Sequence, residues 1–185
     1  MIRLAALLAL ILGQSEEPAW ELVAQDSTLT FAATYDDTPF DGVFETFDVE
    51  FRFDPEAADE ADLRVTVDVR SVDTRNRDVD EALADPEWFD FSAHPQATYV
   101  ASGAGEGKNR AFRMAGDLTI KGITRTIPIE FDWTVEGDSA RVTGTARMRG
   151  DTEVNRLDFD VGTGEWEDPI VGHRVEVNFD LRLKR

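Results

Sequence analysis

Residues 174–184 alternate strictly between apolar and polar side chains, and this two-residue period limits the possible folds more than any other feature. The apolar positions are Val175, Val177, Phe179, Leu181 and Leu183. Successive side chains of a β-strand point to opposite faces, so the pattern predicts a strand with one apolar and one polar face. The same pattern recurs along most of the chain, which indicates an all-β fold.

Further strands are predicted wherever this alternation returns between turn-forming residues. They cover residues 29–35, 43–53, 63–70, 97–101, 112–120, 127–135 and 142–148, after a short opening segment at 20–23. With residues 174–184 the total is about eight strands. The strands do not alternate with helices, as they would in a parallel α/β fold. About eight antiparallel strands close into a barrel that holds one small ligand, and a β-sandwich is the alternative.

One segment, residues 78–91, breaks the alternation. Asp78 and Glu81 are spaced as in a capping box, and Pro86 ends the helical stretch. We therefore expect a short helical insertion followed by a loop. Residues 151–173 contain several glycines and are expected to be irregular.

The chain is strongly acidic, with 38 Asp and Glu against 19 Lys and Arg and a formal net charge of −19. Such a surface repels phosphate backbones, so nucleic acid is not an expected partner. The chain contains no Cys, which rules out disulfides and thiolate metal ligands.

Residues 1–15 have the features of a secretory signal peptide: a basic start at Arg3, an apolar run over residues 4–12, and small residues after it. We expect its removal, a mature domain at residues 16–185, and a periplasmic location. A spanning helix needs roughly 20 apolar residues, and no later segment reaches that length, so stable membrane insertion is not expected.

No motif indicates catalysis or metal binding. The two histidines, His94 and His173, lie far apart and outside any metal-ligand spacing. A faint calcium-loop pattern that starts at Asp151 has Arg156 where an EF-hand requires Gly. We therefore expect no catalytic residue, no metal and no cofactor.

The remaining signal is apolar, with 12 Phe and 4 Trp in the chain. These side chains either fill a core or line a hollow interior. A barrel of long strands has room for a cavity, and each methylene buried there contributes roughly 0.8 kcal/mol. A long hydrocarbon would therefore bind without special polar contacts.

Several segments, read in order, resemble the YceI-like family of exported polyisoprenoid-binding proteins. The segments are Trp20 with Ser27 and Phe31, residues 42–44, Phe47, residues 53–54, 71–74, 88–89, 95–99 and 116–125, and Arg156 with Phe159, Gly162, Gly164 and residues 171–172. The resemblance covers essentially all of residues 20–185. It implies a lipocalin-like barrel that holds a long prenyl chain, such as the tail of a quinone or of a prenyl phosphate, and a non-enzymatic transport or storage role in the periplasm.

Because the family has no short catalytic signature, the lining of the channel is selected by alternation alone. The predicted lining residues are Phe31, Phe47, Phe51, Val67, Met114, Leu118, Phe131, Trp133, Val177 and Phe179, with Trp88 and Phe89 near the mouth. A pyrophosphate head group would need a basic patch, for which the candidates are Arg75, Arg77, Lys121 and Arg125. A neutral quinone head group would not need one.

Two other functions stay open at the level of sequence. One is an enzyme that acts on a small apolar molecule, with a buried carboxylate or His173 as its base. The other is a stress-responsive structural or interaction protein with a filled barrel and no ligand. The sequence also leaves both a monomer and a homodimer open.

Overall fold

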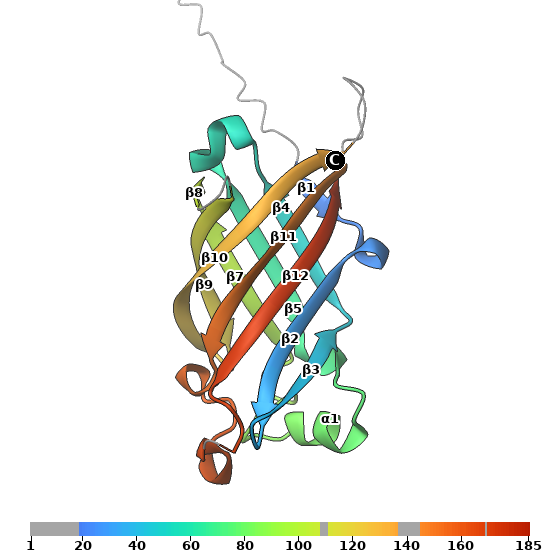
Figure 1. Ribbon diagram of the computed structural model, residues 1–185, viewed down its shortest axis with the longest axis vertical. Coiled ribbons are helices and arrows are strands. Elements are labelled where there is room, and N and C mark those ends of the chain that lie inside the picture. The colour runs from blue at the N-terminus through green and yellow to red at the C-terminus, as the bar shows by residue number, and fades with distance from the viewer. Residues whose placement is uncertain (1–18, 108–110, 137–144, 169) are drawn as a thin grey trace, which may run out of the picture.

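An antiparallel β-sheet rolls into a barrel in the computed structural model, which describes residues 19–107, 111–136, 145–168 and 170–185 (Figure 1). The predicted signal peptide therefore lies outside the described residues, as do residues 142–144 of one predicted strand. No helix within the described ranges is long and apolar enough to cross a membrane.

Eight strands form the closed wall of the described barrel. They are β1 (Trp20–Leu22), β4 (Phe47–Arg52), β5 (Asp62–Asp68), β7 (Gln96–Ser102), β9 (Phe112–Ile120), β10 (Ile123–Glu136), β11 (Thr145–Asn155) and β12 (Arg174–Lys184). Each pairs antiparallel with the next, and β12 closes the ring by pairing with β1, where Leu22 lies opposite Leu183. The prediction of an eight-stranded antiparallel barrel is confirmed.

Three of these strands, β1, β4 and β5, are each extended by a separate strand toward the end of the barrel that carries the helix. β2 (Thr28–Tyr35) continues β1 after a 3-10 turn at Ala24–Asp26, and both strands pair with β12. β3 (Thr38–Phe44) precedes β4, and β6 (Val72–Asp73) follows β5. At this end, β2, β3 and β6 extend the wall next to β12.

The prediction of one strand over residues 43–53 was wrong, and the strand that begins at Thr38 was missed. A break separates β3 from β4, and a tight turn joins β2 to β3. The turn is formed by Asp36 and Asp37, whose φ angles of 48° and 60° lie in the left-handed region that Asp tolerates. Acidic pairs are common in this chain, so the sequence did not mark this pair as a turn.

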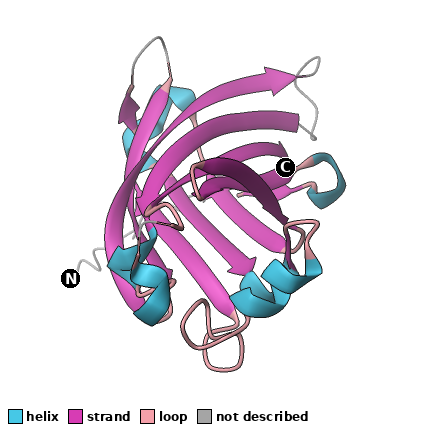
Figure 2. Cartoon of the chain, turned by 60° about the horizontal axis from the view of Figure 1, so that its bottom comes forward, coloured by secondary structure: helices cyan, strands magenta, loops and turns pink. Residues whose placement is uncertain are grey.

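The helical insertion is α1 (Arg77–Leu83), which lies with neighbouring loops across one end of the barrel (Figures 1 and 2). Its N-cap is Asn76, whose side chain accepts a hydrogen bond from the backbone N–H of Asp78. The predicted capping box at Asp78 was therefore wrong by two positions, because the Asn76 amide oxygen is better placed to cap the first turn.

The segment expected to be irregular is partly ordered. β11 continues to Asn155, where it pairs with Arg174 of β12. Two 3-10 turns follow, at Arg156–Phe159 and Gly164–Glu167. They lie at the same end of the barrel as α1 (Figure 1).

Aromatic side chains fill the opposite end of the interior, and we call this cluster the packed end. Its main rings belong to Trp20, Phe51, Phe53, Phe131 and Trp133. The Trp20 and Trp133 rings meet edge to face at 5.3 Å, and Phe51 stacks on Phe53 at 5.0 Å. The indole N–H of Trp20 donates a 3.1 Å hydrogen bond to the Phe53 carbonyl, which satisfies the one polar group of this side chain.

Two strand glycines allow aromatic rings to pack directly over the backbone. Gly42 lies opposite Phe31, and Gly150 lies opposite Phe179. A Cβ atom at residue 42 would lie 2.5 Å from the Phe31 ring, and one at residue 150 would lie 2.6 Å from the Phe179 ring. The Cβ at residue 150 would also collide with the Glu130 carbonyl oxygen.

We predict that Gly150→Ala lowers the free energy of unfolding by about 1–3 kcal/mol, because the Glu130 carbonyl belongs to the backbone and cannot rotate away. Gly105→Ala is the matched control, since nothing lies within 4 Å of a Cβ at that position. Urea denaturation of both variants measures the difference. Equal stability of the two would contradict this steric argument.

Candidate functional site

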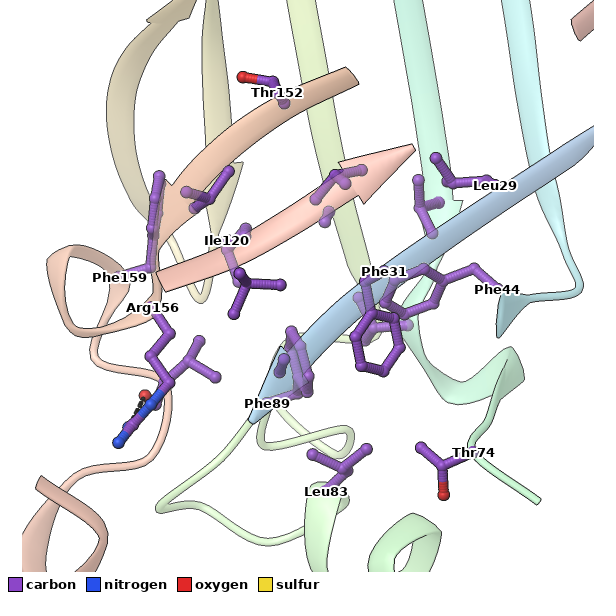
Figure 3. Close-up of a pocket in the computed structure, with 18 of the residues that line it drawn as sticks. Leu29, Phe31, Phe44, Thr74, Leu83, Phe89, Ile120, Thr152, Arg156 and Phe159 are labelled. Carbon is purple, nitrogen blue, oxygen red and sulfur yellow. Dashed lines mark hydrogen bonds between the residues drawn. The ribbon is translucent and has the colours of Figure 1, made fainter. Parts of the chain in front are cut away.

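The barrel interior is hollow between the packed end and α1. The cavity there has a volume of about 840 Å³, and Figure 3 shows part of its wall. Protein interiors contain few voids larger than a water molecule. A predominantly apolar cavity of this size is therefore the candidate ligand-binding site of the chain.

The cavity wall includes eight of the twelve residues that were selected by alternation. These are Phe31, Phe47, Val67, Trp88, Phe89, Leu118, Val177 and Phe179. They come from both halves of the sequence and are brought together by closure of the ring.

The other four predicted residues belong to the packed end and do not line the cavity. They are Phe51, Met114, Phe131 and Trp133. The alternation correctly identifies their inward direction, but it contains no information about height along the barrel axis. On β10, for example, Ile127 and Ile129 reach the cavity, whereas Phe131 and Trp133 lie further along the same inward row and fill the packed end.

The side chains that α1 contributes to the site were not among the predicted lining residues. Val79 and Leu83 line the cavity, and Leu83 is 8% exposed. Figure 3 shows Leu83 and Phe89 close to the same end of the cavity. The helical spacing of the two α1 residues was a usable signal, but spacing does not reveal which surface a helix covers.

The cavity reaches the protein surface between the β2–β3 turn and the start of α1, and we call this opening the mouth. The lining residues exposed there are Tyr35, Asp36, Thr38, Pro39, Asn76 and Asp78. Two of these side chains are carboxylates, and none of the exposed lining residues that the structure describes is Lys or Arg. The mouth therefore has an acidic edge.

The residues considered as a basic patch for a pyrophosphate head group do not line the described cavity, although Arg75 and Arg77 flank Asn76 at the mouth. The candidates were Arg75, Arg77, Lys121 and Arg125. The first two form ion pairs with Asp41 and Glu81. Lys121 donates to two backbone carbonyls, and Arg125 is exposed on β10. None of the four belongs to the described cavity wall.

The buried Arg156 side chain lies at the cavity wall, and its hydrogen bonds all go to the backbone. Arg156 is 4% exposed and donates all five of its side-chain N–H groups to carbonyl oxygens. The acceptors belong to Val161, Gly162, Trp166, Val171 and Gly172, at 2.5–3.1 Å. The Arg156 side chain therefore holds residues 161–166 and 171–172 in place and has no N–H left for a ligand.

The surroundings of Arg156 are shaped to accommodate it. Gly162 has a φ of 73°, and a Cβ atom there would collide with the guanidinium. The guanidinium carbon lies 5.6 Å from the centre of the Trp88 ring, a cation–π distance. Burial lowers the pKa of Arg156, and the nearby charge of Glu167 opposes this effect. No sequence pattern identified this role, because Arg is usually an exposed residue.

Tyr99 contributes a phenol to the cavity wall. Its hydroxyl donates a 3.0 Å hydrogen bond to the Ile127 carbonyl. Burial raises the pKa of Tyr99 to about 12. At neutral pH the cavity wall at this point is therefore uncharged.

The described cavity wall contains no buried carboxylate and no histidine. Its carboxylates, Asp36 and Asp78, are exposed at the mouth. His173, the base considered for an enzyme, is not part of the wall, and its Nε2 lies 3.0 Å from the Glu167 carbonyl oxygen. The described wall therefore presents hydrocarbon rather than acid–base groups to an occupant.

The sequence matches the model of the YceI-like domain over residues 20–183. Among curated relatives, a UPF0312 protein of Vibrio parahaemolyticus is 26% identical over 143 residues, which cover 77% of this chain and 72% of the relative. Protein YceI of Salmonella newport is 26% identical over 122 residues, covering 66% of this chain and 63% of that protein.

Solved structures share the same barrel. Burkholderia cenocepacia BcnA superposes with a TM-score of 0.78 at 31% identity, covering 87% of this chain and 98% of BcnA. A polyisoprenoid binding domain from Saccharophagus degradans superposes with a TM-score of 0.68 at 16% identity, covering 90% of this chain and 98% of that domain. At this lower identity the second likeness concerns the fold alone.

We predict that Arg156→Lys destabilises the fold by about 2–4 kcal/mol. An ammonium has three N–H donors, so at least two of the five carbonyls lose their partner, at roughly 1–3 kcal/mol each. Arg174→Lys is the control, because its ion pair with Glu153 is exposed and such pairs contribute about 0–1 kcal/mol. Urea denaturation compares the variants, and a loss no larger than that of the control would show that the carbonyl contacts do not stabilise the loop.

We predict a stability loss at high pH that depends on Tyr99. The unfolded chain ionises this phenol at its ordinary pKa of 10, whereas the folded chain does so at a pKa of about 12. This contribution to stability is therefore complete below pH 10 and is lost as the pH rises through 12. Tyr99→Phe should flatten the decline of the unfolding free energy in this window, and an unchanged slope would contradict the assignment.

Proposed function

We propose, since the chain belongs to the YceI-like family, that its cavity binds the polyisoprenoid tail of a lipid with an uncharged head group, such as a prenyl quinone. Binding would be non-enzymatic and would serve transport or storage. With residues 1–15 acting as an export signal, the proposed location is the periplasm.

The observation that carries the proposal is the apolar cavity of about 840 Å³. Its wall consists mostly of aliphatic and aromatic side chains, which suit a branched hydrocarbon. Each buried methylene contributes roughly 0.8 kcal/mol, so a long tail needs no polar anchor. The cavity also argues against a filled, purely structural barrel, for which an interior without a sizeable void was expected.

The charges around the mouth support an uncharged head group. Asp36 and Asp78 would repel a phosphate, and the candidate basic residues form ion pairs or hydrogen bonds with other groups of the protein. Arg156 has already donated every N–H. A pyrophosphate would therefore lose its hydration at the mouth without gaining charge-assisted hydrogen bonds.

The described cavity wall also favours binding over catalysis. General acid–base chemistry needs a titratable group within hydrogen-bond reach of the substrate. The deepest ionisable phenol, Tyr99, is held neutral by its raised pKa of about 12 and donates to a backbone carbonyl. The comparison with the Saccharophagus degradans polyisoprenoid binding domain supports the same choice at the level of the fold.

The test is uptake of a prenyl quinone from phosphatidylcholine vesicles, followed by re-isolation of the protein, solvent extraction and mass spectrometry. We expect the wild-type protein to retain quinone. Val177→Trp, which places an indole in the cavity, should reduce retention about tenfold or more. The matched control is Glu176→Trp, because Glu176 is the exposed neighbour on the opposite face of β12.

Absence of quinone from the re-isolated wild-type protein would overturn the proposal. A prenyl phosphate with the same tail provides the second arm. It should be retained about tenfold less than the quinone, given the acidic mouth. Equal retention would show that the head group is not selected by charge.

A further inference from the structure

The cavity has a definite floor, which separates it from the packed end. Five buried residues belong to both the cavity wall and the packed cluster: Val49, Leu63, Ile129, Met148 and Leu181. None of them is more than 7% exposed. They come from β4, β5, β10, β11 and β12, so the floor is supported by strands from around the barrel.

Behind the floor the interior is filled by large side chains. On β4, Val49 is followed in the inward row by Phe51, and on β10 Ile129 is followed by Phe131. Phe51 is 0% exposed and Phe131 is 1% exposed, and their rings meet edge to face at 5.9 Å. A ligand that enters at the mouth therefore meets rings packed at protein density once it reaches the floor.

We infer that this floor limits the lipid tail to about five or six isoprene units and makes Val49 and Met148 determinants of chain length. The inference rests on the proposed function. A water molecule has a share of about 30 Å³ in the liquid. At a similar volume for each methylene-sized group, a cavity of about 840 Å³ holds about 28 carbon atoms. Carbons beyond that number remain in water at the mouth.

The cost of the surplus carbons sets the expected selectivity. Moving one methylene from a bilayer into water lowers the transfer equilibrium constant roughly fourfold. Moving the same methylene from water into the cavity raises it by about the same factor. Transfer from membrane to protein is therefore insensitive to length while the whole tail fits. Each additional isoprene unit that stays outside should reduce transfer by about tenfold or more.

The experiment offers the protein phosphatidylcholine vesicles that carry an equimolar mixture of prenyl quinones, with every tail length from three to ten isoprene units. The re-isolated protein is extracted, and each homologue is quantified by mass spectrometry relative to the vesicles. We expect a flat profile up to about five or six units and a steep fall beyond them. The profile is a ratio within one sample, so a partly unfolded variant still gives a valid result.

Two floor variants should move the limit in opposite directions. Val49→Phe adds four heavy atoms at the floor and should shorten the longest retained tail by about one unit. Met148→Ala removes three heavy atoms and should raise retention of the first excluded homologue about threefold or more. Ala115→Phe, on the exposed face of β9, adds a ring outside the barrel and should leave the profile unchanged.

The outcomes separate this inference from the proposed function. A limit near six units that the floor variants shift supports both. Retention of quinones without any fall up to ten units, or a fall that neither variant moves, overturns the chain-length inference and leaves prenyl binding intact. Retention of no homologue by the wild-type protein overturns the proposed function and the inference with it.

Discussion

Closure of the β-sheet between β12 and β1 is the constraint on which the rest of the structure depends. β1 has only three residues, so its few backbone hydrogen bonds need further contacts to hold β4 and β12 together. Trp20 provides this anchor, because its 2% exposed ring lies among the rings of the packed end and its N–H reaches the Phe53 carbonyl. The aromatic cluster thus stabilises the closed end of the barrel and leaves the other end free to be hollow.

The hollow end is bounded by elements that gain their structure from local polar contacts. Asn76 caps α1, the turn at Asp36 and Asp37 begins β3, and Arg156 satisfies five carbonyls of the loop that follows β11. These contacts are made within the protein, so the polar groups concerned already have partners. The cavity wall can therefore remain apolar although the elements around its mouth are polar.

This separation of polar and apolar side chains is compatible with the proposed binding of a hydrocarbon tail by a strongly acidic protein. More than half of the described Asp and Glu residues lie outside the strands, in loops, turns and helices, while the inward rows of the wall strands are mostly apolar. At the mouth the acidic edge disfavours phosphate, and inside the barrel the match is one of volume and shape. In the proposed function, the length of the tail rather than hydrogen bonding is the basis of selectivity.

Alternation in the sequence determined most of the strands and their inward faces, because a period of two is a local property of β-structure. Closure into a barrel was predicted with a β-sandwich as the alternative. Alternation placed Phe31, Leu118 and Val177 on the interior side, where the structure has them on the cavity wall. Only the tertiary structure decided three other features. They are the position of Phe51 and Phe131 along the barrel axis, the five acceptors of Arg156 and the ion pair of Arg75. Strand register and loop packing set these features. The contacts involved join residues that lie far apart in the sequence, where no periodic pattern links them.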